Sequence, residues 1–496
     1  MKTTVNIIYL AFAVFPFAYF AFSPAVRAVD PPPDGGYPGG NTAEGDNALL
    51  NLTTGRFNTA VGLEALYSDT TGAENTAIGS RALFSNTGSF FGFGSGNTAI
   101  GFQALFNNST GGDNTATGSG VLFNNTTGVS NTAAGVNALS ENTTGGGNTA
   151  IGRSAMIANT TGNFNTATGY LALQWHGSKN TATGAFALQS NDADGNTATG
   201  FEALQKNTTG VGNTADGATA LKVNINGSFN TAIGDRALAS NMDGASNTAT
   251  GVQALFKNAD GVENTACGRE ALFNNAFGYD NTAIGYRALA SNTGTNNIAL
   301  GAFAGVNLTS GINNIDIGAF GHGDDANTIR IGRPPLHNST FIAGIYGVAM
   351  SGNVVVVNSS GKLGVTTSSA RFKDNIQPMD KVSEALTELK PVTFRYKKQI
   401  DPAGTRQFGL VAEEVEKINP DLVVRDKEGK PFSVRYEAVN AMLLNEFLKE
   451  HRTVQELKKE IAQLTATVKE QAVQIQKVSA PVKLSSPPPQ SVLNDQ

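Results

Sequence analysis

A short pattern of polar and small apolar positions repeats along the first two thirds of the chain. The tripeptide Asn-Thr-Ala occurs fifteen times between Asn41 and Asn281, most often at a spacing of 17 residues. Degenerate copies begin at Asn297 and Asn314, and a five-residue insertion lies at Phe90 to Gly94. A fixed short period sustained over this length predicts a solenoid, in which each unit contacts only its neighbours.

Within one unit, the pentad Asn-Thr-Ala-x-Gly predicts a short strand with the threonine and x side chains on one face. The opposite face carries alanine and glycine, which permit close approach of backbones. The x position is often apolar, as at Val61 and Ile78, and an Ala-Leu pair such as Ala65-Leu66 supplies a second apolar contact. The Asn-x-x-Gly segment that follows predicts a turn, because asparagine and glycine tolerate positive φ.

Each unit offers only a few small apolar side chains for burial. Their hydrophobic stabilisation is marginal against the backbone entropy lost when the unit becomes ordered. We therefore expect hydrogen bonds between units, with asparagine and threonine ladders in register, to supply the remainder. Association of three chains along a common axis would strengthen such a thin solenoid further.

Two different apolar patterns follow the repeat. Alternating segments between Asn327 and Val365 predict a β-rich neck with strands at residues 328–332, 341–345 and 353–358. From Ala438 the chain predicts one long helix, and its apolar positions step by three and four residues. This heptad seam, in which Gln471 is polar, predicts a trimeric coiled coil. The seam comprises Val454, Leu457, Ile461, Leu464, Val468, Gln471, Ile475 and Val478.

The N-terminal residues have the pattern of a secretory signal peptide. Lys2 precedes an apolar run from Ile7 to Phe22, and Val26-Arg27-Ala28 provides small residues for cleavage after Ala28. The run is shorter than the roughly 20 residues that a membrane span needs. We therefore expect an exported protein, secreted or at the cell surface, with no stable membrane span in the mature chain.

Composition and charge narrow the possible chemistry. The net charge of −5 provides no basic field, which argues against nucleic acid as a partner. Cys267 is the single cysteine, so the chain cannot form an internal disulfide framework. The four histidines are scattered and lack the spacing of zinc ligands, so we expect no metal and no cofactor. They are His176, His322, His337 and His451.

The repeat unit over residues 41–319 resembles the head repeats of trimeric autotransporter adhesins, which are parallel β-rolls. That resemblance implies a surface fibre or adhesin whose target is an unidentified cell-surface or glycan partner. The 17-residue period is longer than the units usual in those adhesins.

A second resemblance covers roughly residues 368 to 460. Its motifs are S-S-A-R-F-K-D-N-I at Ser368, L-T-E-L-K-P-V-T-F-R-Y at Leu386, Q-F-G-L-V-A-E-E-V at Gln407 and V-R-Y-E at Val434. In this order they resemble the C-terminal intramolecular chaperone autoprotease of endosialidase tailspikes and tail fibres. The myelin regulatory factor family carries a similar domain.

That family implies a Ser-Lys dyad, with the serine directly after the cleaved bond and the lysine five residues later. Ser368 and Lys373 match this spacing, which places the cleaved bond between Thr367 and Ser368. A serine nucleophile needs a base, and burial at a trimer interface would favour the neutral lysine that can serve as one. Ser369 stands where the family usually has an acid, and the adjacent serines leave the register open. The alternative makes Ser368 a turn or helix cap and Lys373 a solvated charge.

The sequence thus predicts a mainly β protein: a parallel β-solenoid stalk, a β-rich neck and a small α+β chaperone domain ending in a long coiled-coil helix. We expect an exported homotrimeric fibre whose chaperone domain trimerises the chain and then removes itself as a single-turnover serine endopeptidase. A non-cleaving fibre with a permanent trimer clamp, or a phage-type tail fibre, are the alternatives. The predicted segments are the signal peptide 1–28, a Pro/Gly-rich leader 29–40, the stalk 41–319, the neck 320–367, the chaperone domain 368–437, the coiled-coil helix 438–478 and a disordered tail 479–496.

Overall fold

The computed structural model describes residues 37–88, 93–337, 339–343, 345, 351–358, 360–426 and 428–479. The predicted signal peptide, most of the predicted leader and nearly all of the predicted tail lie outside these residues. The chain divides into two compact units, Met1–Phe341 and Ile342–Gln496, each of which is described by itself.

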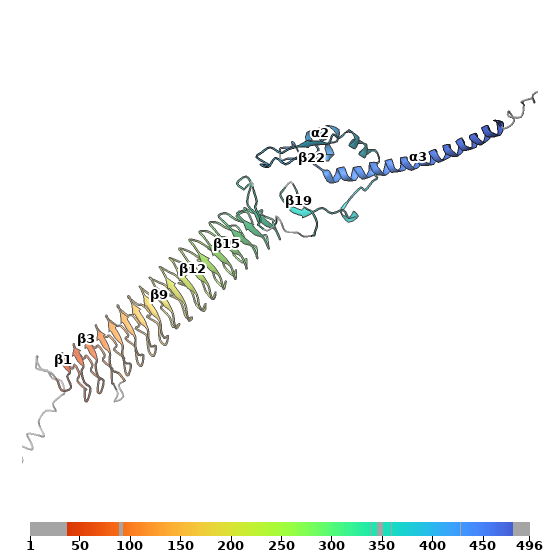
Figure 1. Cartoon of the computed structure of the whole chain (residues 1–496). Helices are drawn as coiled ribbons and strands as arrows, with labels where there is room; N and C mark the ends of the chain where they lie inside the picture. Colours follow the sequence, from red (N-terminus) through yellow and green to blue (C-terminus); the bar gives the residue numbers. More distant parts are fainter. Residues whose placement is uncertain are drawn as a thin grey trace, which may run out of the picture. The chain divides into compact units, whose positions relative to one another are not determined.

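The first unit contains a parallel β-solenoid, as the repeat predicts (Figure 1). Each rung contributes one three-residue strand to an 18-stranded sheet, and successive strands pair in register, as Thr132 with Thr149 and Ala133 with Ala150. The strands are β1 Thr42–Glu44, β2 Thr59–Val61, β3 Thr76–Ile78, β4 Thr98–Ile100, β5 Thr115–Thr117, β6 Thr132–Ala134, β7 Thr149–Ile151, β8 Thr166–Thr168, β9 Thr181–Thr183, β10 Thr197–Thr199, β11 Thr214–Asp216, β12 Thr231–Ile233, β13 Thr248–Thr250, β14 Thr265–Cys267, β15 Thr282–Ile284, β16 Ile298–Leu300, β17 Ile315–Ile317 and β18 Ile329–Ile331.

The core of the solenoid consists mainly of alanine and leucine. In the rung that begins at Asn131, the strand residue Ala133 and the pair Ala138-Leu139 are buried, whereas Thr132 and Ala134 face outward. Equivalent residues from Ala43 to Leu308 form one continuous cluster. The middle residue of each strand therefore points inward. The threonine and x positions share one face, as predicted, but that face is the outer one, so the apolar x residues do not enter the core.

Two buried asparagine ladders run through the stalk. The backbone N–H of Asn131 donates to Asn114 Oδ1 (3.0 Å), and Asn131 Nδ2 donates to the Gly145 carbonyl (2.9 Å). In the second ladder, Asn142 Nδ2 donates to Asn125 Oδ1 (2.7 Å) and to the Gly145 carbonyl (3.0 Å). Buried amides that are hydrogen-bonded in this way avoid the desolvation penalty of unpaired polar groups. The predicted asparagine ladders are confirmed.

The turns differ from the prediction. The left-handed residues of this rung are Gly135, Asn137, Leu139 and Gly147, with φ values of 122°, 57°, 50° and 69°, and none of them belongs to the Asn-x-x-Gly segment. Gly145 of that segment lies outside the left-handed region and is glycine for another reason. A Cβ there would lie 2.5 Å from the Gly162 carbonyl oxygen and from Asn142 Oδ1. Close stacking of rungs, and not positive φ, requires this glycine.

The solenoid continues beyond the predicted limit at residue 319. Strand β18 pairs in parallel with β17, so the first predicted neck strand is the last rung of the sheet. Charged residues take the inward alanine position here: Asp316 in β17 and Arg330 in β18. Arg330 donates Nε and Nη2 to the two carboxylate oxygens of Asp325. This polar layer ends the apolar core.

The second unit combines short strand pairs with helices. The described residues 341–343 and 345, within a predicted neck strand, form no strand. Two antiparallel pairs, β21–β22 and β23–β24, accompany α2 around a small core made of Val415, Leu422, Val423, Val434 and Met442. The elements are the hairpin β19 Val355–Val357 and β20 Leu363–Val365, then η1 Ala370–Phe372, η2 Asp380–Glu388, β21 Val392–Phe394, β22 Gln407–Gly409, α2 Ala412–Ile418, η3 Pro420–Leu422, β23 Val423–Arg425, β24 Pro431–Val434 and α3 Tyr436–Ser479.

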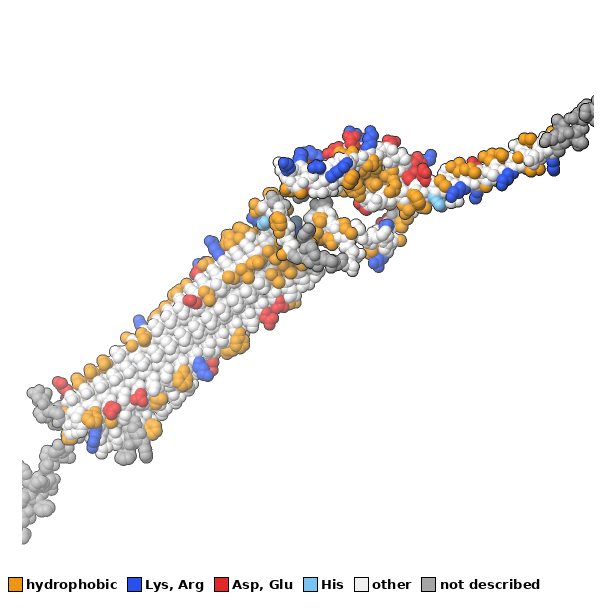
Figure 2. Space-filling view, in the orientation of Figure 1, with side chains coloured by type: hydrophobic (Ala, Val, Ile, Leu, Met, Phe, Trp, Pro, Cys, Tyr) orange, Lys and Arg blue, Asp and Glu red, His pale blue; other side chains and the backbone are white. Residues whose placement is uncertain are grey.

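Helix α3 begins two residues before the predicted start and carries an uncovered apolar seam. Leu457, Ile461 and Leu464 are 49%, 61% and 64% exposed. Figure 2 shows hydrophobic side chains along the length of this helix. No other described element of the chain covers the seam, so the coiled coil stays a prediction. Among the described residues, no helix is both long and apolar enough to cross a membrane.

Candidate functional site

One turn of 3-10 helix brings Ser368 and Lys373 together. In η1 the backbone N–H groups of Phe372 and Lys373 donate to the carbonyls of Ser369 and Ala370, both at 3.1 Å. This turn brings the Lys373 side chain back toward Ser368, which lies two residues before the turn begins. Lys373 Nζ then donates a hydrogen bond to Ser368 Oγ at 3.2 Å. The five-residue spacing noted in the sequence therefore corresponds to a direct contact.

The neighbouring serine occupies a different position. Ser369 is the residue before η1, with extended φ and ψ of −63° and 138°, and its side chain forms no capping hydrogen bond. Lys373 contacts Ser368 and not Ser369. Of the two adjacent serines, the contact with Lys373 thus involves Ser368, and the identity of the nucleophile stays a prediction.

The pair is uncovered in the single chain. Thr367, Ser368 and Lys373 are all exposed. Apolar residues close to the pair in the chain are also uncovered: Phe372 is 59% exposed and Ile376 is 66% exposed. A base must accept the serine proton, whereas Lys373 here acts as the donor. The serine and lysine side chains are thus in contact, but in the single chain they are exposed to water.

A second Ser-Lys contact lies between η2 and α3. Ser383 is fully buried, and its Oγ donates to Glu446 and accepts from Asn445 Nδ2 (2.7 Å) and Lys449 Nζ (3.4 Å). The hydrogen bond to Glu446 raises the pKa of Lys449, and the same bond lowers the pKa of Glu446. Lys449 is thus held in its charged form, which donates but cannot act as a base.

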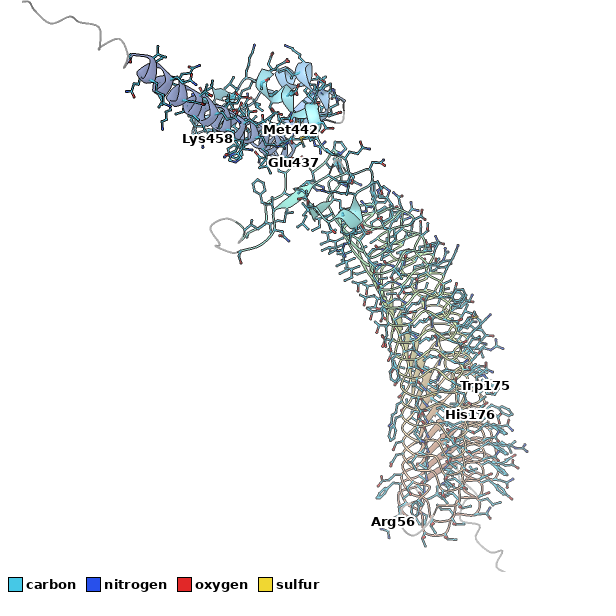
Figure 3. The ribbon with its side chains drawn as sticks, turned by 90° about the vertical axis from the view of Figure 1, so that its right-hand side faces the viewer. Arg56, Trp175, His176, Glu437, Met442 and Lys458 are labelled. Atoms are coloured by element: carbon cyan, nitrogen blue, oxygen red, sulfur yellow. The ribbon has the colours of Figure 1, made fainter. Side chains whose placement is uncertain are left out.

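Sequence reasoning missed this polar cluster, because Ser383 and Lys449 are 66 positions apart. The spacing of Glu446 and Lys449, three residues apart on a helix, was the one local signal for it. The cluster attaches the start of α3 to η2. Met442, labelled on the same part of α3 in Figure 3, packs into the small core of the unit.

The histidines and acidic residues do not form a metal site within the described part of the chain. No group of three His, Cys, Asp or Glu side chains there is placed to hold an ion. His176 lies on the stalk beside Trp175 (Figure 3), and its Nδ1 is 3.6 Å from Asp192. Trp175 and His176 belong to the rung that begins at Asn165, which has 15 residues in place of 17. This shorter rung interrupts the second asparagine ladder and leaves Asn159 Oδ1 without a hydrogen bond.

Comparison with known proteins gives one match. A peptidase family model described as the chaperone of endosialidase matches residues 368–424. The matched region begins at Ser368, the serine that contacts Lys373, and follows the β-solenoid stalk. The resemblance inferred from the sequence motifs is confirmed. No curated protein and no solved structure matches the chain.

Proposed function

We propose that the region from Ser368 onward is an intramolecular chaperone that gathers three copies of the chain and then cuts itself from the stalk. The observation that carries this proposal is the 3.2 Å hydrogen bond between Lys373 Nζ and Ser368 Oγ. It lies at the first residue of the region that matches the chaperone of endosialidase. The product is a fibre made of the stalk, whose target is an unidentified cell-surface or glycan partner.

The chemistry requires only groups in this segment and one water. Neutral Lys373 takes the Ser368 hydroxyl proton, and Ser368 Oγ attacks the carbonyl carbon of Thr367. The peptide C–N bond breaks, and the nitrogen takes the proton from Lys373 and becomes the amino terminus of Ser368. Water then hydrolyses the Thr367 ester, which regenerates the Ser368 hydroxyl and leaves a carboxylate on Thr367.

Association of copies would supply the missing environment. Burial disfavours a charged lysine, so a partner that covers Lys373 would favour its neutral form. The apolar surface of this unit provides a reason to associate: the α3 seam is exposed, and so is the hairpin residue Val355, at 61%. Cutting would thus follow assembly. Removal of the chaperone then leaves a stalk that cannot unfold along the path by which it formed.

A denaturing gel of the full chain tests the proposal. The wild-type protein is expected to give two fragments, the smaller beginning Ser368-Ser369-Ala370 by N-terminal sequencing. Ser368→Ala and Lys373→Ala are expected to give one uncut band, because each removes one partner of the hydrogen bond. Ser369→Ala, a matched change one residue away, is expected to cut normally.

Two results would contradict the proposal. A wild-type chain that associates but stays whole would make this region a permanent clamp, and the protein a purely structural fibre. Cutting that persists in Ser368→Ala would assign the nucleophile elsewhere.

We further propose that the chain is exported. The support is the signal-peptide pattern of residues 1–28, which lie outside the described residues. Protein recovered from its native cells is expected to begin at Val29. A mature chain that retains Met1 would rule out cleaved export and favour a phage-type tail fibre.

A further inference from the structure

The outer face of the stalk sheet is unlike the other surfaces of the stalk. Each strand presents its first and third residues outward, and among these positions only Glu44 and Asp216 are charged. Elsewhere on the stalk some charged side chains form ion pairs between rungs, such as Arg81 with Glu64 and Lys222 with Glu202. The sheet face is therefore a nearly uncharged strip that runs the length of the solenoid.

One row of this strip consists of threonines with free hydroxyls. The first strand residue is threonine in every strand from β1 to β15. Across the described residues these hydroxyls form no hydrogen bond, whereas the turn threonines Thr126 and Thr143 donate to the carbonyl of the next rung (2.9 Å each). The strand threonines are thus available to a partner, in a row that repeats at the strand spacing.

The strip becomes aliphatic at its C-terminal end. All six outward residues of β16, β17 and β18 are isoleucine or leucine. Figure 2 shows hydrophobic side chains gathered near the last strands of the stalk. The most uncovered are Ile329 and Ile331, at 66% and 68% exposure, and Ile298 and Leu300 are 44% and 47% exposed. An exposed aliphatic patch of this kind is typical of a surface that a partner covers.

We infer that this strip is the surface through which the stalks of different copies of this chain contact one another, with the aliphatic patch at β16–β18 as its strongest part. The inference rests on the proposed self-association and adds the surface that the stalk contributes to it. A copy of the same chain fits because the strip is self-complementary: threonine hydroxyls both donate and accept, and aliphatic rows pack on aliphatic rows.

The area of the strip is large enough for a stable contact with another copy of the chain. Eighteen strands at a spacing of about 4.8 Å, each about 10 Å long, give a face of roughly 850 Å² per copy. Stable protein interfaces bury about 800 Å² on each partner. The α3 seam is also uncovered in the single chain, so both apolar surfaces would be covered by the same assembly.

The native cysteine provides a probe of this contact. Cys267 is the third residue of β14 and is exposed on the strip. In full-length protein carrying Ser368→Ala, which keeps the chaperone attached, a short bis-maleimide is expected to link chains through Cys267. Cys267→Thr should abolish the link. Moving the thiol to Ile312→Cys in that background should not restore it, because Ile312 is similarly exposed (44%) but lies outside the strip.

A positive charge introduced into the aliphatic patch at β16–β18 provides a second test. Ile317→Lys and Ile331→Lys are each expected to reduce Cys267 cross-linking by about tenfold, because an ammonium group in the interface must be desolvated. Ile312→Lys serves as the matched control and should leave the yield unchanged.

Light scattering and the cleavage gel distinguish a failure of this inference from a failure of the proposed function. If the chains are oligomeric and are cut normally in the wild type, yet Cys267 does not cross-link, the inference is wrong and the proposed function stands. If a single copy is found in solution, the inference is wrong, and the gel shows independently whether the chain still cuts itself.

Discussion

The stalk and the C-terminal unit bury their apolar side chains to very different degrees. In the stalk, Leu139 and its equivalents are fully buried by residues of the same chain. In the described part of the C-terminal unit the core has only five buried residues, while Leu464 and Phe447 are each 64% exposed. Apolar surface left uncovered on this scale marks a contact surface. The core of the stalk is complete in one copy, whereas the C-terminal unit is suited to partners.

This difference in burial depends on whether one chain supplies the neighbours that each element needs. Each rung of a solenoid contacts the rungs before and after it, so one chain supplies every partner that the core needs. A single amphipathic helix has no such neighbour and buries its seam only against another helix. The helix with this uncovered seam lies in the same unit as residues 368–424, which match the chaperone of endosialidase.

Leucine truncation in the two regions should give the largest contrast. Leu139→Ala is expected to lower the free energy of unfolding of the stalk by about 2–5 kcal/mol, because it leaves a cavity in a closed core. Leu464→Ala should leave the stalk unchanged and weaken self-association. Urea unfolding at two protein concentrations, with sedimentation, distinguishes the two. A concentration-dependent effect of Leu139→Ala would contradict the view that the core of the stalk is complete in one copy.

The next largest effect concerns Asp69, which occupies an asparagine position in the second ladder. Its side chain is fully buried, and its Oδ2 makes no hydrogen bond. Burial raises the pKa of Asp69 from 3.8 to about 6. The folded state therefore holds the proton more tightly than the unfolded state. Its contribution to stability is complete below about pH 4 and is lost as the pH rises to about 6.

The change Asp69→Asn should remove this pH dependence. At pH 7 it is expected to raise the free energy of local unfolding by about 3 kcal/mol, since an amide has no charge to desolvate and donates to the Gly72 carbonyl. Hydrogen exchange of the first rungs, corrected for intrinsic rates, measures the effect. The exposed Asp113→Asn is the control. A loss of protection in Asp69→Asn would contradict the stated cause.

The smallest effect is expected at the Ser383 cluster. Ser383→Ala removes a buried hydroxyl that contacts Glu446, Asn445 and Lys449, and should cost about 1–2 kcal/mol. The loss should appear as faster hydrogen exchange at the start of α3, with the stalk unaffected. Ser433→Ala, on an exposed part of β24, is the matched control. Normal self-cleavage in Ser383→Ala is also expected, because Lys449 is held charged and is not a base.

The sequence predicted the parts of the fold that depend on local pattern. The 17-residue period identified the strands and the asparagine ladders. The resemblance to the endosialidase chaperone singled out Ser368 and Lys373, whose side chains are in contact. The left-handed conformation of Leu139 was not predictable, because leucine has no preference for it and stacking between rungs imposes it.

Two further features required the folded chain. Ile329–Ile331 joins the solenoid although the Asn-Thr-Ala motif has ended, since its backbone stays in register with β17. Ser383 and Lys449 meet only after α3 packs on η2.

The backbone contact between Gly145 and Gly162 gives the stalk a fixed unit of length. Removal of one whole unit, such as residues 131–147, would bring Asn148 onto Asn114 with the same hydrogen bonds and shorten the stalk by about 4.8 Å. Removal of half a unit would place asparagines opposite leucines and break both ladders. The distance that the stalk spans is therefore determined by the number of rungs it contains.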